Sequence, residues 1–174
     1  HCDVAIVTNV ASDHIGLGGI HTIEQMAQVK AVVPETVFPH GYAILNADDD
    51  LVYQMKKTLK CNVALFSMDE KNPRIQNHCQ AGGLATVYEN GYVSILKGTW
   101  KIRVLAVKDI PLTYGGKAQH NIANTLPAVL AAYLFKTISI EDIRQALQTF
   151  VPSSVLTPGR LNFFHFKKFT MLAD

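Results

Sequence analysis

The sequence lacks the features that would place it in several classes of protein. It has three cysteines, Cys2, Cys61 and Cys79, and no CxxC pair, which argues against a disulfide framework or a zinc site and indicates reduced thiols in a cytoplasmic protein. Its net charge is only +2 and no dense block of Lys or Arg occurs, so nothing indicates a nucleic-acid partner. No apolar run reaches the roughly 18 residues of a membrane span, and no signal peptide is recognisable. We therefore expect a cytoplasmic protein with no nucleic-acid or membrane partner.

What is present is typical of a globular α/β domain. The chain has 174 residues, of which 48% are hydrophobic and 17% are charged. It begins with His1 rather than Met, and we expect it to be a piece of a longer protein. Apolar runs at 4–10, 41–45 and 62–66 read as buried strands. A capping box at Thr22 predicts a helix over 23–33 that Pro34 closes, and the acids at 48–50 predict a second helix to about residue 59.

This alternation predicts a mostly parallel sheet with flanking helices, joined by a smaller antiparallel β segment. The antiparallel part is expected over 84–110, where alternating apolar residues flank Asn90-Gly91, a strong hairpin signal. A long helix should begin at His120, and Ser139 should cap another. The Pro- and Ser-rich stretch 153–160 reads as a linker, which predicts one domain over 1–152 and the start of a second over 161–174.

Polar residues follow the predicted parallel strands directly. Asp13-His14, the turn at 46–49 and Ser67 all stand where ligands bind on such sheets, at the carboxyl ends of the strands. His14 is either a metal ligand or a hydrogen-bonded loop residue. Lys30 lies on the apolar stripe of its helix, so it either extends outward to solvent or faces the site with a partner.

A second group of polar residues opens the helix at 120. Asn121 and Asn124 lie three residues apart on one face and suit a planar heterocycle such as adenine, although N-capping would also explain one of them. The preceding Gly-Gly-Lys fails the phosphate-binding pattern GxxxxGK[ST]. Arg160, beside the linker, is either a surface arginine or a clamp for a phosphate.

With these residues in view, the sequence resembles the Mur ligase family, and within it the cyanophycin synthetase branch. The likeness is carried by CDVAIVTNVASDHIGLGG, GYAILNADDD, IPLTYGGKAQHNIAN and TPGRLNFF, in the family's order. It implies a P-loop NTPase-like central domain that uses ATP and Mg²⁺. It also implies that His14 is a metal ligand, that Lys30 is the lysine that many members carbamylate, and that the Asp-rich turn at 46–49 is architectural. By the same likeness His120, Asn121 and Asn124 pack against adenine, and Arg160 reaches the nucleotide phosphates.

The resemblance also implies a reaction. An ATP-dependent ligase of this branch joins arginine to the side-chain carboxylate of an aspartate-containing polymer through an acyl phosphate. The family's P-loop would precede His1, so we expect this piece alone to be inactive and the full-length parent to be a homo-oligomer. The alternatives are a Mur-type ligase acting on muramyl peptides or folates, and a non-catalytic assembly module that binds no nucleotide.

Overall fold

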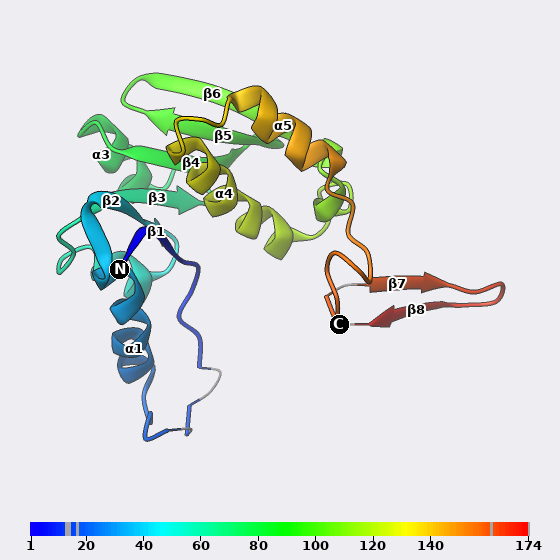
Figure 1. Ribbon diagram of the computed structural model, residues 1–174, viewed down its shortest axis with the longest axis horizontal. Coiled ribbons are helices and arrows are strands. Elements are labelled where there is room, and N and C mark those ends of the chain that lie inside the picture. The colour runs from blue at the N-terminus through cyan, green and yellow to red at the C-terminus, as the bar shows by residue number, and fades with distance from the viewer. Residues whose placement is uncertain (13–14, 17, 161, 174) are drawn as a thin grey trace.

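A six-stranded sheet forms the centre of the chain, which we describe from a computed structural model over residues 1–12, 15–16, 18–160 and 162–173 (Figure 1). Its strands are β1 (Cys2–Val7), β2 (Val37–Asn46), β3 (Asn62–Ser67), β4 (Leu84–Glu89), β5 (Tyr92–Lys97) and β6 (Trp100–Ala106). They lie side by side in sequence order, with β1 to β4 parallel and with β5 and β6 each antiparallel to the preceding strand. The expected α/β fold with a mostly parallel sheet is confirmed.

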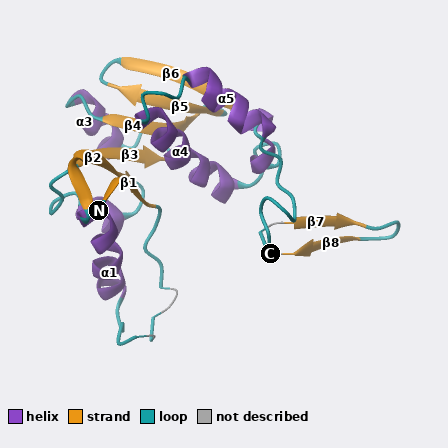
Figure 2. Ribbon diagram, viewed as in Figure 1, coloured by secondary structure: helices purple, strands orange, loops and turns teal. Residues whose placement is uncertain are grey.

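Helices cover both faces of the sheet (Figure 2). Three crossover helices, α1 (Ile23–Glu35), α2 (Asp50–Met55) and α3 (Pro73–Gln80), connect the parallel strands and pack on one face. The other face is covered by α4 (Gln119–Leu134), which crosses β2 to β5, and by α5 (Ile140–Thr149), which packs beside α4 and β6. Because the sheet is covered on both faces, its central strands must be apolar on both sides.

Alternate residues of each central strand enter different cores. Ile44 and Phe66 are buried beneath α4, whereas Leu45 and Leu65 are buried against the crossover helices. Side chains of a strand point to opposite faces in turn, so a strand with both faces covered reads as an unbroken apolar run. The runs in the sequence therefore mark the centre of the sheet correctly.

The first crossover helix follows its local signals at one end only. The predicted capping box is present, with the Thr22 hydroxyl accepting from the Gln25 amide and the Gln25 side chain returning the contact. The prediction that Pro34 closes the helix is wrong, because the helix runs through Pro34 to Glu35 and is capped by Thr36. Proline has no backbone N–H, so Pro34 removes one hydrogen bond from the last turn of the helix, and the helix ends one residue later.

The second strand starts four residues earlier than expected, at Val37, where it pairs with the start of β1 across an irregular register. Gly41 lies at this irregularity, where a Cβ atom would collide with the carbonyl oxygen of Asp3 and approach Val37. The absence of a side chain therefore lets the two strands come together. The second helix is shorter than expected. Asp49 caps its start, and it ends at Met55 rather than near residue 59.

The region around Asn90-Gly91 forms the predicted hairpin. Both residues have positive φ, 48° and 84°, as a tight turn between β4 and β5 requires. The antiparallel part continues the same sheet, because β4 pairs in parallel with β3 and antiparallel with β5. The helix α3 was not expected, although Asn72 caps it and Pro73 occupies its first turn.

Two 3₁₀ turns, η1 (Val107–Asp109) and η2 (Pro111–Thr113), lead from β6 to α4. Beyond α5 the chain continues through the predicted linker into a separate two-stranded sheet, β7 (Asn162–His165) paired with β8 (Thr170–Ala173). The ring of Phe163 meets the ring of Tyr114 edge-on at 5.3 Å between centroids. Among the described residues, none of the helices combines the length and the hydropathy that a membrane span requires.

Candidate functional site at the carboxyl ends of the strands

The loop that follows β1 is held from α1 by Lys30. The Lys30 ammonium donates a hydrogen bond to the backbone carbonyl of Asn9 over 3.0 Å, and the side chain is half-buried. Of the two alternatives for this lysine, the geometry agrees with the one that faces the strand end. Asp13 and His14 lie outside the described residues, so their placement stays a prediction.

The same loop is tied to the end of β2 by two side chains. The Asn46 amide donates to the Thr8 carbonyl over 2.8 Å, and one oxygen of Asp49 accepts from the Val10 amide over 2.7 Å. The other oxygen of Asp49 accepts from the Leu51 and Val52 amides, both at 3.0 Å, at the start of α2. One carboxylate thus caps a helix and fixes the neighbouring loop.

Asp48 makes the corresponding connection to the end of β3. Its carboxylate accepts from the Ser67 hydroxyl over 2.6 Å, from the Met68 amide over 2.7 Å and from the Asn72 side chain over 2.8 Å. Both acids of the turn are therefore engaged by donors of the protein itself. These bonds agree with the architectural role predicted for the turn at 46–49.

The start of α4 lies at the edge of the sheet where the parallel strands end, as the arrowheads in Figure 1 show. Its N-cap is Ala118, which offers no side-chain hydrogen bond, so the N-capping alternative for the asparagines is wrong. The Asn121 amide instead donates to the Leu112 carbonyl in η2 over 2.7 Å. His120 and Asn124 are exposed on either side of it.

A large apolar groove of about 680 Å³ lies between α4 and α5, beside these residues. Its walls include Leu112, Val129, Ile143 and Phe150, and Asn124 supplies an amide. Apolar walls with a few polar groups are typical of sites that bind organic ligands. Sequence patterns did not reveal this groove, because it exists only where α5 packs against α4.

The remaining predicted residue, Arg160, is exposed at the end of the linker. Its amide donates to the Thr157 carbonyl over 3.2 Å, which closes a turn just before β7. Lys30 and the start of α4 thus share an edge of the sheet, whereas Arg160 belongs to the linker. Within the described part of the chain, no three His, Cys, Asp or Glu side chains are placed to hold a metal ion.

An α/β domain with its polar loops gathered at the carboxyl ends of parallel strands belongs to the class of ligand-binding α/β folds. Residues 1–132 match the Mur ligase middle domain. The chain therefore belongs to the Mur ligase middle-domain family.

Comparison with individual proteins shows which members of the family this chain is most similar to among those reported below. The chain is 53% identical over 173 residues to a cyanophycin synthetase from Synechocystis sp., a match that covers 99% of this chain and 20% of that protein. A UDP-N-acetylmuramate–L-alanine ligase from Acetivibrio thermocellus is 27% identical, over 86% of this chain and 29% of that protein. The crystal structure of MurF from Acinetobacter baumannii superposes with a TM-score of 0.65 at 21% identity, covering 99% of this chain and 33% of that one, and this likeness shows the fold. The chain thus spans about one fifth of the length of the cyanophycin synthetase.

Proposed function

We propose that this chain is the central part of an ATP-dependent amide ligase of the cyanophycin synthetase type. In this proposal the whole protein joins the α-amino group of arginine to the side-chain carboxylate of an aspartate-containing polymer. The observation that carries it is the 53% identity that runs along 173 residues of the chain. The 27% identity to a muramate–alanine ligase supports a Mur-type substrate less strongly.

The proposed nucleotide site lies at the start of α4. We place adenine beside His120, Asn121 and Asn124, with the apolar groove between α4 and α5 providing a surface for the ring. The position of Asn121 supports this assignment, because its bond to the Leu112 carbonyl holds the side-chain amide in place at the start of α4. Arg160 would contact the phosphates from the linker.

The proposed metal site lies at the end of β1. The resemblance to the Mur ligases assigns His14 as the metal ligand, and the bonds that Asp48 and Asp49 accept give these two acids the structural role of joining the strand ends. Bound Mg²⁺ supplies neutralisation of the phosphate charge. An unmodified Lys30 would place a second cation here, whereas carbamylation would turn it into an anion. By the same resemblance we assign Lys30 the catalytic role beside the metal, and many members of the family carbamylate the matching lysine.

The reaction consists of two displacements. The substrate carboxylate attacks the γ-phosphorus of ATP, and the bond to the β-phosphate oxygen breaks to release ADP. The neutral amine of arginine then attacks the acyl carbon, phosphate leaves with the bonding electrons of the C–O bond, and the amine loses a proton. Both steps depend mainly on positioning. The hydrogen bonds between the ends of β1, β2 and β3 would supply it.

We further propose the domain boundaries 1–152, 153–160 and 161–174, which the separate sheet of β7 and β8 supports. We also propose that the complete protein is a homo-oligomer, which light scattering of the purified protein would test. The 174-residue piece alone is expected to be inactive. ATP hydrolysis by this piece that His14→Ala abolishes would contradict that expectation.

Incorporation of labelled arginine by the complete protein tests the function directly. With ATP, Mg²⁺ and an aspartate–arginine primer, we expect incorporation that Lys30→Ala or His14→Ala lowers by roughly 100-fold or more. Lys57→Ala, at an exposed lysine after α2, serves as the control and should retain activity. If arginine were not incorporated and ATP were consumed only when another amino acid was supplied, the ligase reaction would stand and the proposed substrate would be wrong. Absence of any nucleotide binding would favour the non-catalytic assembly module.

A further inference from the structure

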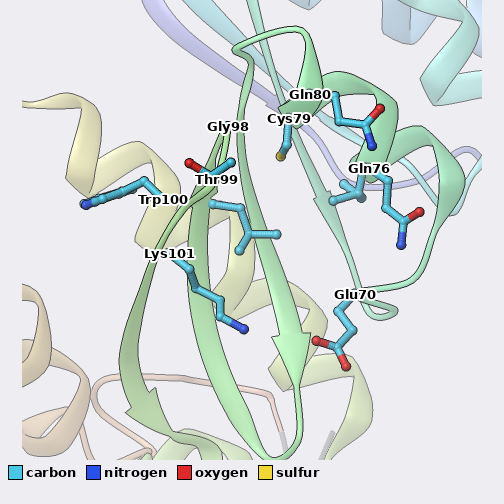
Figure 3. A pocket seen from close by; sticks show the side chains of 10 residues that line it. Glu70, Gln76, Cys79, Gln80, Gly98, Thr99, Trp100 and Lys101 are labelled. Atoms are coloured by element: carbon cyan, nitrogen blue, oxygen red, sulfur yellow. The ribbon is translucent and has the colours of Figure 1, made fainter.

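A second cavity, of about 290 Å³, lies on the other face of the sheet from α4, between α3 and the β5–β6 hairpin (Figure 3). Its apolar lining comes from Ile75 and Cys79 of α3 and from Leu96 of β5. Glu70, in the loop after β3, and Lys101, on β6, line it with charged groups. The cavity is separate from the nucleotide site proposed above, because none of its lining residues belongs to that site.

Lys101 is held in place by a buried carboxylate. Glu89, at the end of β4, is only 3% exposed, and one of its oxygens accepts from Lys101 over 2.8 Å and from Arg103 over 3.0 Å. Burial alone would raise the pKa of Glu89, but the two cations outweigh that effect and hold the pKa below its usual value.

Both cations keep donors for a ligand. Their side chains are 43% and 52% exposed, and an ammonium has three donors and a guanidinium five, of which Glu89 takes one from each. Figure 3 shows the Lys101 amine and the Glu70 carboxylate on facing sides of the cavity. Glu89, and to a lesser degree Glu70, raises the pKa of Arg103, so Glu70 lies within electrostatic reach of this cluster. Of these four charged groups, Lys101 and Glu70 line the cavity, and Glu89 holds Lys101 in position.

We propose that this cavity binds an arginine branch of the aspartate–arginine polymer, an inference that rests on the function proposed above. The α-carboxylate of the branch meets Lys101, its guanidinium meets Glu70, and its aliphatic stem lies against Leu96 and Cys79. The volume lies at the lower end of the range for ligand cavities, about 300 Å³, which suits one branch rather than a whole oligomer.

The same carboxylate and guanidinium occur in free arginine, and charge distinguishes the two sources. Free arginine carries an α-ammonium beside its carboxylate, and Lys101 in the cavity wall would repel that ammonium. In the polymer that nitrogen is a neutral amide, so the polymer branch is favoured. A branch held here keeps the growing polymer near the ligase site and raises its effective concentration there.

Binding and kinetics of the complete protein test the proposal. Fluorescence polarisation with a labelled oligomer of aspartate–arginine units, without ATP, should show at least fivefold weaker binding for Glu70→Gln and a larger loss for Glu70→Arg. Lys57→Ala, at the exposed lysine after α2, should leave this binding unchanged. In the arginine-incorporation assay, Glu70→Gln should raise the KM for primer at least fivefold, with kcat and the KM for free arginine and for ATP unchanged. Asp3→Asn, an exposed carboxylate on β1, is the matched control and should behave as wild type.

Unchanged oligomer binding in both Glu70 variants would overturn the proposal. A rise in the KM for free arginine with no change for the primer would overturn it as well, since the cavity would then bind the free amino acid. Loss of all arginine incorporation in the wild-type protein would refute the proposed function only. Binding of the oligomer that still depends on Glu70 would support the cavity independently of that result.

Discussion

Replacing Asp49 with alanine should lower the free energy of unfolding by about 2–4 kcal/mol, since one carboxylate serves two elements. The capping bonds to the Leu51 and Val52 amides would be lost, at a typical cost of about 1 kcal/mol. The amide of Val10, a residue that is 8% exposed, would lose a charged acceptor at 2.7 Å, which costs roughly 1–3 kcal/mol more. Asp49→Asn should cost less than Asp49→Ala, because asparagine still caps the helix. Part of the cost should remain, because the NH₂ group of asparagine cannot accept the hydrogen bond from the Val10 amide.

Urea unfolding followed by circular dichroism and by the fluorescence of Trp100, the single tryptophan, measures these losses. Asp50→Asn is the control, because it removes a neighbouring carboxylate that is 76% exposed and whose ion-pair partner among the described residues is Arg74. Its expected cost is below about 1 kcal/mol. If Asp49→Ala cost no more than Asp50→Asn, the link between the β1 loop and α2 would not contribute to stability, and the reasoning would be wrong.

Three further predictions concern the rest of the fold. Burial lowers the pKa of His78 below its usual value of 6.5, so the unfolded chain binds a proton at this ring more readily than the folded chain does. The free energy of unfolding should therefore be highest above pH 6.5 and should decrease as the pH falls. His78→Gln should remove this part of the pH dependence of unfolding. Gly41→Ala should destabilise the protein by about 1–3 kcal/mol, because the added methyl would collide with the Asp3 carbonyl, and an unchanged Tm would contradict this. Glu89→Gln should lower the free energy of unfolding, measured in urea, by about 1–2 kcal/mol. This loss is smaller than that from breaking a fully buried ion pair, because Lys101 and Arg103 are partly exposed. The loss should decrease in 1 M salt.

Features determined by neighbouring residues could be predicted from the sequence. The capping box at Thr22, the helix cap at Ser139 and the Asn90-Gly91 turn are all present, because each depends on contacts within a few residues. The helix α3 was missed because its eight residues, PRIQNHCQ, are mostly polar and show no long apolar stripe. Its only local signal was Asn72 followed by Pro73, a cap and a first-turn proline.

Helical periodicity indicated the position of one candidate residue. The stripe that begins at Ile23 includes Lys30 but left two directions open for its side chain, and the hydrogen bond to the Asn9 carbonyl agrees with the direction toward the strand end. The role of Asn121 could not be read in the same way, because its partner is the Leu112 carbonyl in a turn that only the fold brings close. The different partners of Asp48 and Asp49 likewise depend on tertiary contacts with separate strands.

The strictly sequential order of the strands has a consequence for how the chain acquires its structure during synthesis. Each strand from β2 to β6 pairs with the strand made just before it, so the sheet can grow in the order of translation without waiting for a distant segment. The helix α4 is made only after all six strands, yet it covers β2 to β5. Until it docks, the apolar face that contains Ile44 and Phe66 stays uncovered, and this interval is when the nascent chain is most prone to aggregate.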